Sequence, residues 1–305
     1  MTRALVASIV TGFQVGAALV ASEAVVADVG AGRLGFLRYA IALTLIVPVA
    51  LNARGPGVAR RDLLPVALIG IGQFGVLVAL LNVAVLHAGS PRVALVFATL
   101  PVVTLVLGLG FAGGRVSRLE FGSILLSVVG VAVLLGGDAL GGRLGPSDWT
   151  GLSCAGGATL IGALCSHLYR PYLQRNGVTQ VGMIAMAASL LPLGLMSLAE
   201  GGGVPIGQWS TRTLVLLGFV GVSSGFGFIL WLYALTHLQA AVVTAFLGLS
   251  PVTATVLAVL FLGATPSATQ VGAVALVVGS LVAIAFAQRR SRSLAVAAPA
   301  PGSAD

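Results

Sequence analysis

The chain has 305 residues, of which 58% are hydrophobic and 8% are charged, and its mean hydropathy is +1.08. A soluble domain carries about 25% charged residues, so this composition excludes a water-soluble protein. All sixteen basic residues are arginine, against eight acidic residues, and this excess indicates membrane topology rather than a nucleic-acid-binding surface.

Apolar segments long enough to cross a bilayer recur along the chain. A spanning helix needs about 20 mostly apolar residues. The segments predict an all-α polytopic membrane protein with ten transmembrane helices, at residues 5–25, 34–52, 63–86, 91–111, 117–136, 149–169, 178–199, 212–235, 240–262 and 268–287. Residues 288–305 have little apolar surface to bury and are predicted to form a disordered cytoplasmic tail. A cleaved signal peptide at the N-terminus is the alternative, and it would leave nine helices.

Arginine placement predicts the orientation. With the N-terminus inside, eleven arginines fall on the inner side and five on the outer side, so both termini are expected in the cytoplasm. Every Trp and Tyr, including Tyr39, Tyr169 and Trp231, falls near a predicted helix end, which favours anchoring at the bilayer interface over stacking on a substrate. The absence of lysine, with heavy use of Ala, Gly, Val and Arg, is typical of a high-GC bacterium and hence of an inner-membrane protein.

The chain repeats itself at a fixed offset. Residues 87–133 return at residues 237–283 without a gap, so that Pro101 matches Pro251, and 251 − 101 gives an offset of 150. Duplication within apolar sequence predicts two halves of five helices, over residues 1–137 and 148–287. Because five is odd, the second half starts on the opposite side of the membrane, and the halves are expected to be inverted repeats with a site at their interface.

The two copies follow a known pattern. The run LNVAVLHAG at residues 81–89 precedes Pro101, and the copy LYALTH at residues 232–237 precedes Pro251. Together with Arg38 near the start of the second predicted helix, these motifs resemble the EamA domain of the drug/metabolite transporter superfamily over about residues 4–287. The resemblance implies a ten-helix exporter or exchanger of small metabolites and does not choose a substrate. The chain departs from the family after Gly113 and Gly263, where an acidic residue is common and here Gly114-Arg115 and Ala264-Thr265 follow.

A transport site needs polar groups near the bilayer midplane. Eight neutral polar residues fall near the centres of predicted helices: Gln14, Gln73, Thr99, Thr104, Ser223, Ser224, Ser250 and Thr253. A cavity lined by them would suit a neutral or zwitterionic solute, either amino-acid-like or drug-like. The alternative is that the hydroxyls bond back to their own helices or bridge neighbouring ones. The glutamines are the stronger candidates, because a buried amide has several hydrogen-bonding groups to satisfy.

Two further pairs of residues have expected roles. Pro101 and Pro251 fall near mid-helix and are each expected to free the carbonyl group four residues earlier, at Phe97 and Leu247, which makes them hinge candidates; simple packing kinks are the alternative. No charged residue falls at a predicted helix centre. Glu23 is the deepest acid and is expected to pair with Arg38, the alternative being that it binds a proton coupled to transport.

The sequence therefore predicts a secondary transporter that works by alternating access, with no catalytic residue, metal or cofactor. A membrane-embedded enzyme is the runner-up, and it would need a paired acid and base at one depth, which the sequence does not offer. Residues 221–225 match GxSxG, but they lie inside an apolar helix and no base falls at the depth of Ser223. A non-transporting scaffold is third. The expected partners are a small-molecule substrate, the lipid bilayer and, through small-residue motifs in the fifth and tenth helices, a second copy of the chain in a homodimer; nucleic acid is not an expected partner.

Overall fold

A computed structural model describes residues 2–53, 57–112, 144–201, 204–238 and 240–276, with isolated positions at 122, 126, 129–130, 133, 278–279 and 282. Within these residues every regular element is a helix, and eight helical segments are long and apolar enough to cross a membrane. They correspond to eight of the ten predicted helices. Most of the predicted helix at 117–136, the end of the one at 268–287 and the tail at 288–305 lie outside the described residues, although 268–276 are helical.

The eight segments are built from the following elements. The first half contains α1 (Thr2–Val29), α2 (Ala31–Asn52), a third segment of α3 (Arg60–Gly70), η1 (Ile71–Val76) and α4 (Leu77–Ala88), and a fourth of α5 (Ser90–Phe97) and α6 (Leu100–Ala112). The second half contains α8 (Pro146–Arg175), α9 (Val178–Ala199), the short η2 (Ile206–Gln208), α10 (Thr211–His237) and a last segment of α11 (Ala240–Ala245), η3 (Phe246–Leu249) and α12 (Ser250–Leu262).

Glycine allows the tightest connections. Gly30 alone separates α1 from α2 and has φ 92°, and Gly89 alone separates α4 from α5 with φ 76°. Only glycine adopts these positive φ values without steric cost. The third segment contains a stretch of π-helix, η1, which the sequence did not predict; such widened turns often occur at functional sites.

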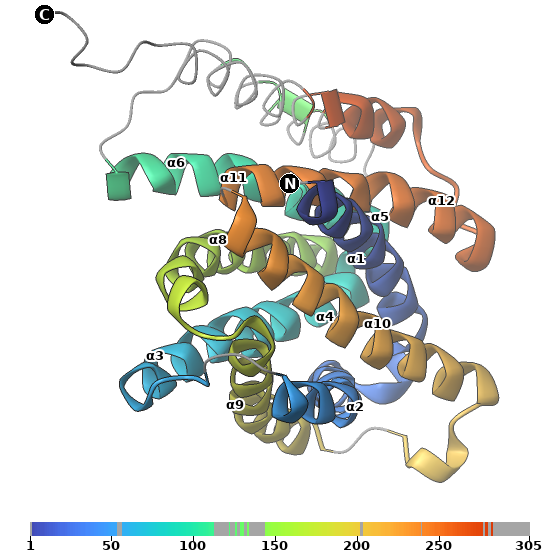
Figure 1. The fold of residues 1–305 in the computed structure, drawn as a ribbon. Coiled ribbons are helices and arrows are strands. Elements are labelled where there is room, and N and C mark those ends of the chain that lie inside the picture. Colours follow the sequence, from blue (N-terminus) through green and yellow to red (C-terminus); the bar gives the residue numbers. More distant parts are fainter. Residues whose placement is uncertain are drawn as a thin grey trace, which may run out of the picture.

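The helices pack in pairs that join the two halves of the chain. Helix α1 packs along α10, α8 packs along α4, and α2 packs against α9. In Figure 1, α2 and α9 lie together at one end of the molecule, α5, α6, α11 and α12 lie at the other, and α1, α4, α8 and α10 lie between them. The centre of the molecule is therefore walled by helices from both halves.

Small residues permit close approach of the helices. A Cβ atom added at Gly16 of α1 would lie 2.5 Å from the carbonyl oxygen of Ser250 and 2.7 Å from Cβ of Thr253, so α1 and the start of α12 touch backbone to backbone. This is the contact expected of small-residue motifs in membrane helices, where packing rather than water exclusion holds helices together.

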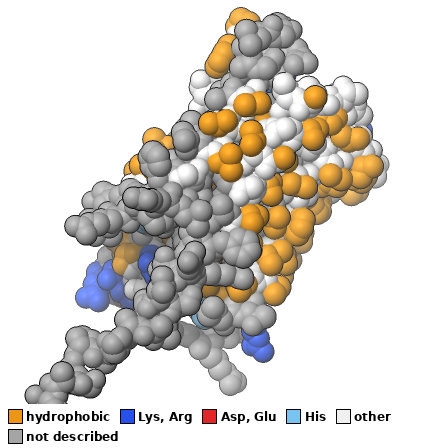
Figure 2. Space-filling model, turned by 90° about the horizontal axis from the view of Figure 1, so that it is seen from above, with side chains coloured by type: hydrophobic (Ala, Val, Ile, Leu, Met, Phe, Trp, Pro, Cys, Tyr) orange, Lys and Arg blue, Asp and Glu red, His pale blue; other side chains and the backbone are white. Residues whose placement is uncertain are grey.

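The outer surface is apolar. On α12, Val256 is 52% exposed and Leu260 and Phe261 are each 68% exposed. Hydrophobic side chains cover much of the described part of the face in Figure 2, and basic side chains lie at its margins. An apolar surface of this extent is stable against lipid and not against water, so the chain is a multi-pass membrane protein.

Candidate functional site

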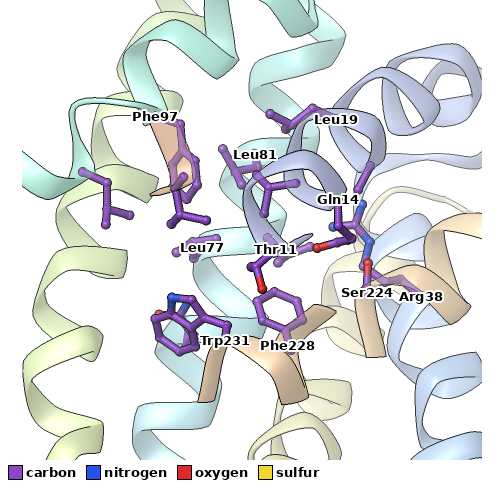
Figure 3. A pocket seen from close by; sticks show the side chains of 16 residues that line it. Thr11, Gln14, Leu19, Arg38, Leu77, Leu81, Phe97, Ser224, Phe228 and Trp231 are labelled. Atoms are coloured by element: carbon purple, nitrogen blue, oxygen red, sulfur yellow. The ribbon is translucent and has the colours of Figure 1, made fainter. Parts of the chain in front are cut away.

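A central cavity lies between helices of both halves. Its walls come from α1, α2, η1, α4 and the α5–α6 junction of the first half, and from α10 and η3 of the second. It encloses about 590 Å³ of empty space, its open mouth included. Most of the wall is apolar, as in small-molecule sites generally, and a few polar groups interrupt it. In Figure 3, Arg38, Gln14 and Ser224 gather on one side and Phe97 and Trp231 on the opposite side.

Three of the eight predicted site residues come together at this cavity. Gln14 from α1, Gln73 from η1 and Ser224 from α10 all line it, although they are far apart in sequence. Thr11, one turn before Gln14 on α1, also lines it and was not predicted. The structure therefore brings both predicted glutamines to one site.

The other five predicted residues lie away from this cavity. Four of them donate their hydroxyl to a carbonyl group of their own segment: Thr99 to Val96 (2.7 Å), Thr104 to Leu100 (2.7 Å), Ser223 to Val220 (3.4 Å) and Thr253 to Leu249 (3.0 Å). This is the back-bonding that the sequence left open as the alternative. Ser250 is fully buried, and its hydroxyl has no hydrogen-bond partner.

A charged residue that was not expected at the site lines the cavity. Helix α2 begins at Ala31, three residues before its predicted start, which places Arg38 about 10 Å along the helix. Arg38 is 6% exposed and lines the cavity. The expectation of a cavity lined only by neutral groups was therefore wrong, since a guanidinium group forms part of the wall.

The predicted ion pair between Glu23 and Arg38 is also corrected by the structure. Glu23 accepts a hydrogen bond from the backbone N–H of Ser90 at 2.6 Å, where it caps the first turn of α5. Arg38 instead donates from Nη2 to the Ser22 hydroxyl at 2.6 Å. The two side chains thus bind different partners, because α5 presents unpaired N–H groups to the acid.

Three buried polar atoms of cavity-lining residues have no hydrogen-bond partner among the residues that the structure describes. They are Nε of Arg38, Oε1 of Gln73 and Nε1 of Trp231. A buried polar group without a partner costs about 1–3 kcal/mol. Two donors and one acceptor of residues that line the cavity are thus left unsatisfied.

The aromatic side chains near the cavity are packed inside the protein. Trp231 is 3% exposed and Tyr39 and Tyr169 are fully buried, so the prediction that they anchor the bilayer interface was wrong. The Trp231 ring lies edge-on to Tyr169 at 6.2 Å between centroids, and Phe74 lies edge-on to Phe228 at 4.5 Å. These contacts hold the Phe228 and Trp231 rings in the cavity wall.

Both repeat-equivalent prolines stand at breaks in their segments. Pro101 follows a turn at Ala98–Thr99 between α5 and α6, and Pro251 lies in the first turn of α12, directly after η3. The Leu247 carbonyl group, predicted to be free, accepts the N–H of Ser250. Phe97 and Leu247 line the cavity, so the chain changes its helical geometry beside the site in both copies.

Comparison with known proteins connects this architecture to transport. The EamA-like transporter family matches residues 2–136 and again residues 144–286. The chain is 31% identical over 249 residues to a probable terminal-alkyne amino-acid exporter of Streptantibioticus cattleyicolor, covering 78% of this chain and 80% of that protein. It is 23% identical over 250 residues to an uncharacterized transporter of Clostridium kluyveri, covering 80% of each.

A solved crystal structure shares the fold, with a TM-score of 0.71, 20% identity and coverage of 95% of this chain and 99% of the other. The family matches span most of the sequence and name a transporter rather than an enzyme. The chain belongs to the EamA-like transporter family of the drug/metabolite transporter superfamily.

Proposed function

We propose that the protein exports a small amino-acid-like solute across the inner membrane, and that the solute binds in the central cavity. The observation that carries this proposal is the set of buried, unpaired polar atoms of Arg38, Gln73 and Trp231 in an otherwise apolar wall. Such a wall suits a solute with a polar end and an apolar end. The 31% identical relative is named as a probable amino-acid exporter, which supports the same class of cargo.

Alternating access between two inverted halves is the proposed mechanism. The family matches twice, over two parts of similar length. The contacts support the same division, because the pairs α1–α10 and α8–α4 exchange when residues are shifted by the 150-residue offset. With five helices in each half, the pseudo-twofold axis lies in the membrane plane, and both termini face the cytoplasm. Pro101 and Pro251 are the proposed hinges of the two copies.

An efflux assay tests the proposal. Cells expressing the protein are loaded with apolar dipeptides, which intracellular peptidases cleave, and the amino acids that appear outside are measured. The wild-type protein is expected to accelerate efflux over cells with empty vector. Gln73→Ala is expected to lower the efflux rate on the order of tenfold, because it removes a buried amide that lines the cavity.

Thr104→Ala is the matched control, since Thr104 is fully buried, bonds to its own helix and lies away from the cavity. Its efflux should stay close to that of the wild type at equal expression. Equal efflux from wild-type and empty-vector cells, for every amino acid measured, would contradict the proposed function.

A further inference from the structure

We propose that the solute carries a free carboxylate and that Arg38 binds it. This inference rests on the proposed function and narrows it. Among amino-acid-like solutes, it selects those with a free carboxylate group. It also excludes amines, amides and esters of the same size.

The first argument is that Arg38 is a buried charge. Its side chain lies in the middle of a membrane protein with 6% exposure, and a guanidinium group stays protonated there. A charge removed from water is strongly unfavourable unless an opposite charge and hydrogen bonds compensate it. The Ser22 hydroxyl that accepts from Nη2 is a neutral group, and Nε has no partner in the part of the chain that the structure describes.

The second argument is that the acids of the described chain bind elsewhere. Each of the five has a different partner: Glu23 binds Ser90, Asp28 binds Thr213, Asp62 binds Arg175, Asp148 binds Arg92 and Glu200 binds Gly32. No acidic residue of the described ranges lines the cavity. Among the residues that the structure describes, none therefore neutralises Arg38, and a carboxylate in the cavity would supply the counter-ion.

The third argument concerns the shape of the donor. A guanidinium group is planar, and its fork of N–H groups matches the two oxygens of a carboxylate. Ser22 holds the Nη2 end, which orients the group, and Nε has no hydrogen-bond partner among the described residues. In Figure 3, Gln14 and Ser224 lie on the same side as Arg38, where they offer neutral partners to a second polar group of the solute.

The apolar walls complete the selection. Leu77, Leu81 and Phe97 face the remaining volume and suit an aliphatic or aromatic tail. A solute with an amino group and no carboxylate would place a second positive charge beside Arg38, and no negative charge would offset the repulsion between the two. Charge therefore discriminates between an amino acid and its amide or decarboxylated amine.

A binding experiment on the purified wild-type protein tests the inference without any variant. The thermal stability of the protein in detergent is measured with four probes of one shape, leucine, 4-methylpentanoate, leucinamide and 3-methylbutylamine, and with sodium sulfate at matched ionic strength. The two carboxylates are expected to raise the unfolding temperature, and the amide, the amine and sulfate are not. Equal stabilisation by all four probes, or by none of them, would overturn the inference.

Variants locate the effect. Arg38→Gln is expected to weaken carboxylate binding on the order of tenfold or more, because it removes a charge-assisted contact. Arg38→Lys should recover part of the binding, since it keeps the charge without the planar fork. Arg33→Gln is the matched control, as Arg33 lies on the same helix, bonds to the Val204 carbonyl group and does not line the cavity. If Arg38→Gln folds and binds leucine as the wild type does, the assignment is wrong.

The outcomes separate this inference from the proposed function. Carboxylate-specific stabilisation without transport in reconstituted vesicles would keep the Arg38 site and contradict the transport function. Transport of leucine and leucinamide at equal rates would keep the transport function and contradict the carboxylate site.

Discussion

At the scale of single residues, Ser22 controls the position of the buried charge. It is 1% exposed, and its hydroxyl accepts the hydrogen bond from Nη2 of Arg38. Ser22→Ala is expected to keep the charge and loosen its orientation. Because a hydrogen bond to a charged group contributes about 1.5–3 kcal/mol, the KM for the transported carboxylate should rise by on the order of tenfold.

The control for Ser22 is Ser8→Ala. Ser8 is equally buried on the same helix and donates its hydroxyl to the Ala4 carbonyl group. Uptake kinetics in reconstituted vesicles measure both variants. An unchanged KM for Ser22→Ala, or an equal change for both variants, would contradict the positioning role.

The sequence predicted which polar residues line the candidate cavity only where the chemistry of the side chain decides its hydrogen bonding. An amide in an apolar helix has groups that its own backbone does not satisfy, and Gln14 and Gln73 both line the cavity. A hydroxyl can return its hydrogen bond to its own helix, and Thr104 and Thr253 do so. The position of Arg38 was predicted wrongly because it depends on where α2 begins, and that of Trp231 because it depends on how aromatic rings pack between helices. Local sequence determines neither.

At the scale of elements, the close contact between α1 and α12 leaves no room for a side chain at Gly16 of α1. A Cβ atom at Gly16 would meet backbone and side-chain atoms of Ser250 and Thr253 at 2.5–2.7 Å. Gly16→Ala is therefore expected to lower the free energy of unfolding by about 1–3 kcal/mol through overpacking. A thermal unfolding curve in detergent measures it.

The same substitution at Gly156 of α8 provides the comparison. A Cβ atom there meets nothing within 4 Å, and alanine is the better helix former, so Gly156→Ala should leave stability unchanged or raise it by up to about 1 kcal/mol. Equal unfolding temperatures for the two variants would show that α1 and α12 do not touch as described.

Glu23 joins two other elements, α1 and α5. Its carboxylate caps Ser90, and glutamine keeps an acceptor oxygen for this bond while alanine does not. Glu23→Gln is thus expected to retain transport driven by a pH gradient, and Glu23→Ala to lower stability by about 0.5–2 kcal/mol. Loss of gradient-driven transport in Glu23→Gln, with exchange of solute preserved, would instead assign proton coupling to this acid.

Breaks in the helical segments were predictable where a residue type restricts the backbone, as proline does. Pro101 and Pro251 marked breaks that the structure shows, because proline lacks the N–H that a continuous helix needs. The π-helix at Ile71–Val76 lies within an ordinary apolar run and contains no residue that would predict its wider turn. Gln73 in this π-helix lines the cavity.

At the scale of the whole molecule, helix α8 is held to the first half at both of its ends. Asp148 in its first turn pairs with Arg92 at 2.7 Å, and Arg175 in its last turn pairs with Asp62 at 2.7 Å. Their partners, Asp62 in α3 and Arg92 in α5, flank the cavity-lining elements η1 and α4 in sequence. Under the proposed alternating access, a movement of α8 relative to the first half would open one or both of these contacts.

The last prediction tests the proposed inversion of the halves, and the repeat itself supplies the matched pair of positions. Gly57 lies between α2 and α3, Gly207 lies between α9 and α10, and 207 − 57 gives the same offset of 150. Neither position has an atom within 4 Å of an added Cβ, so cysteine is tolerated at both. Cys154 and Cys165 are first replaced by serine to remove the native thiols.

Five membrane crossings between these two positions place them on opposite faces, and four would place them on the same face. A membrane-impermeant maleimide applied to intact cells is expected to label Gly207→Cys from outside and to label Gly57→Cys only after permeabilisation, because arginine placement puts the Gly57 loop inside. Labelling of both positions from one side would mean that residues 117–136 do not cross the bilayer, and the two halves would then be parallel rather than inverted. The side of the membrane from which each cysteine is labelled thus decides whether the two halves are inverted, as the proposed alternating access requires.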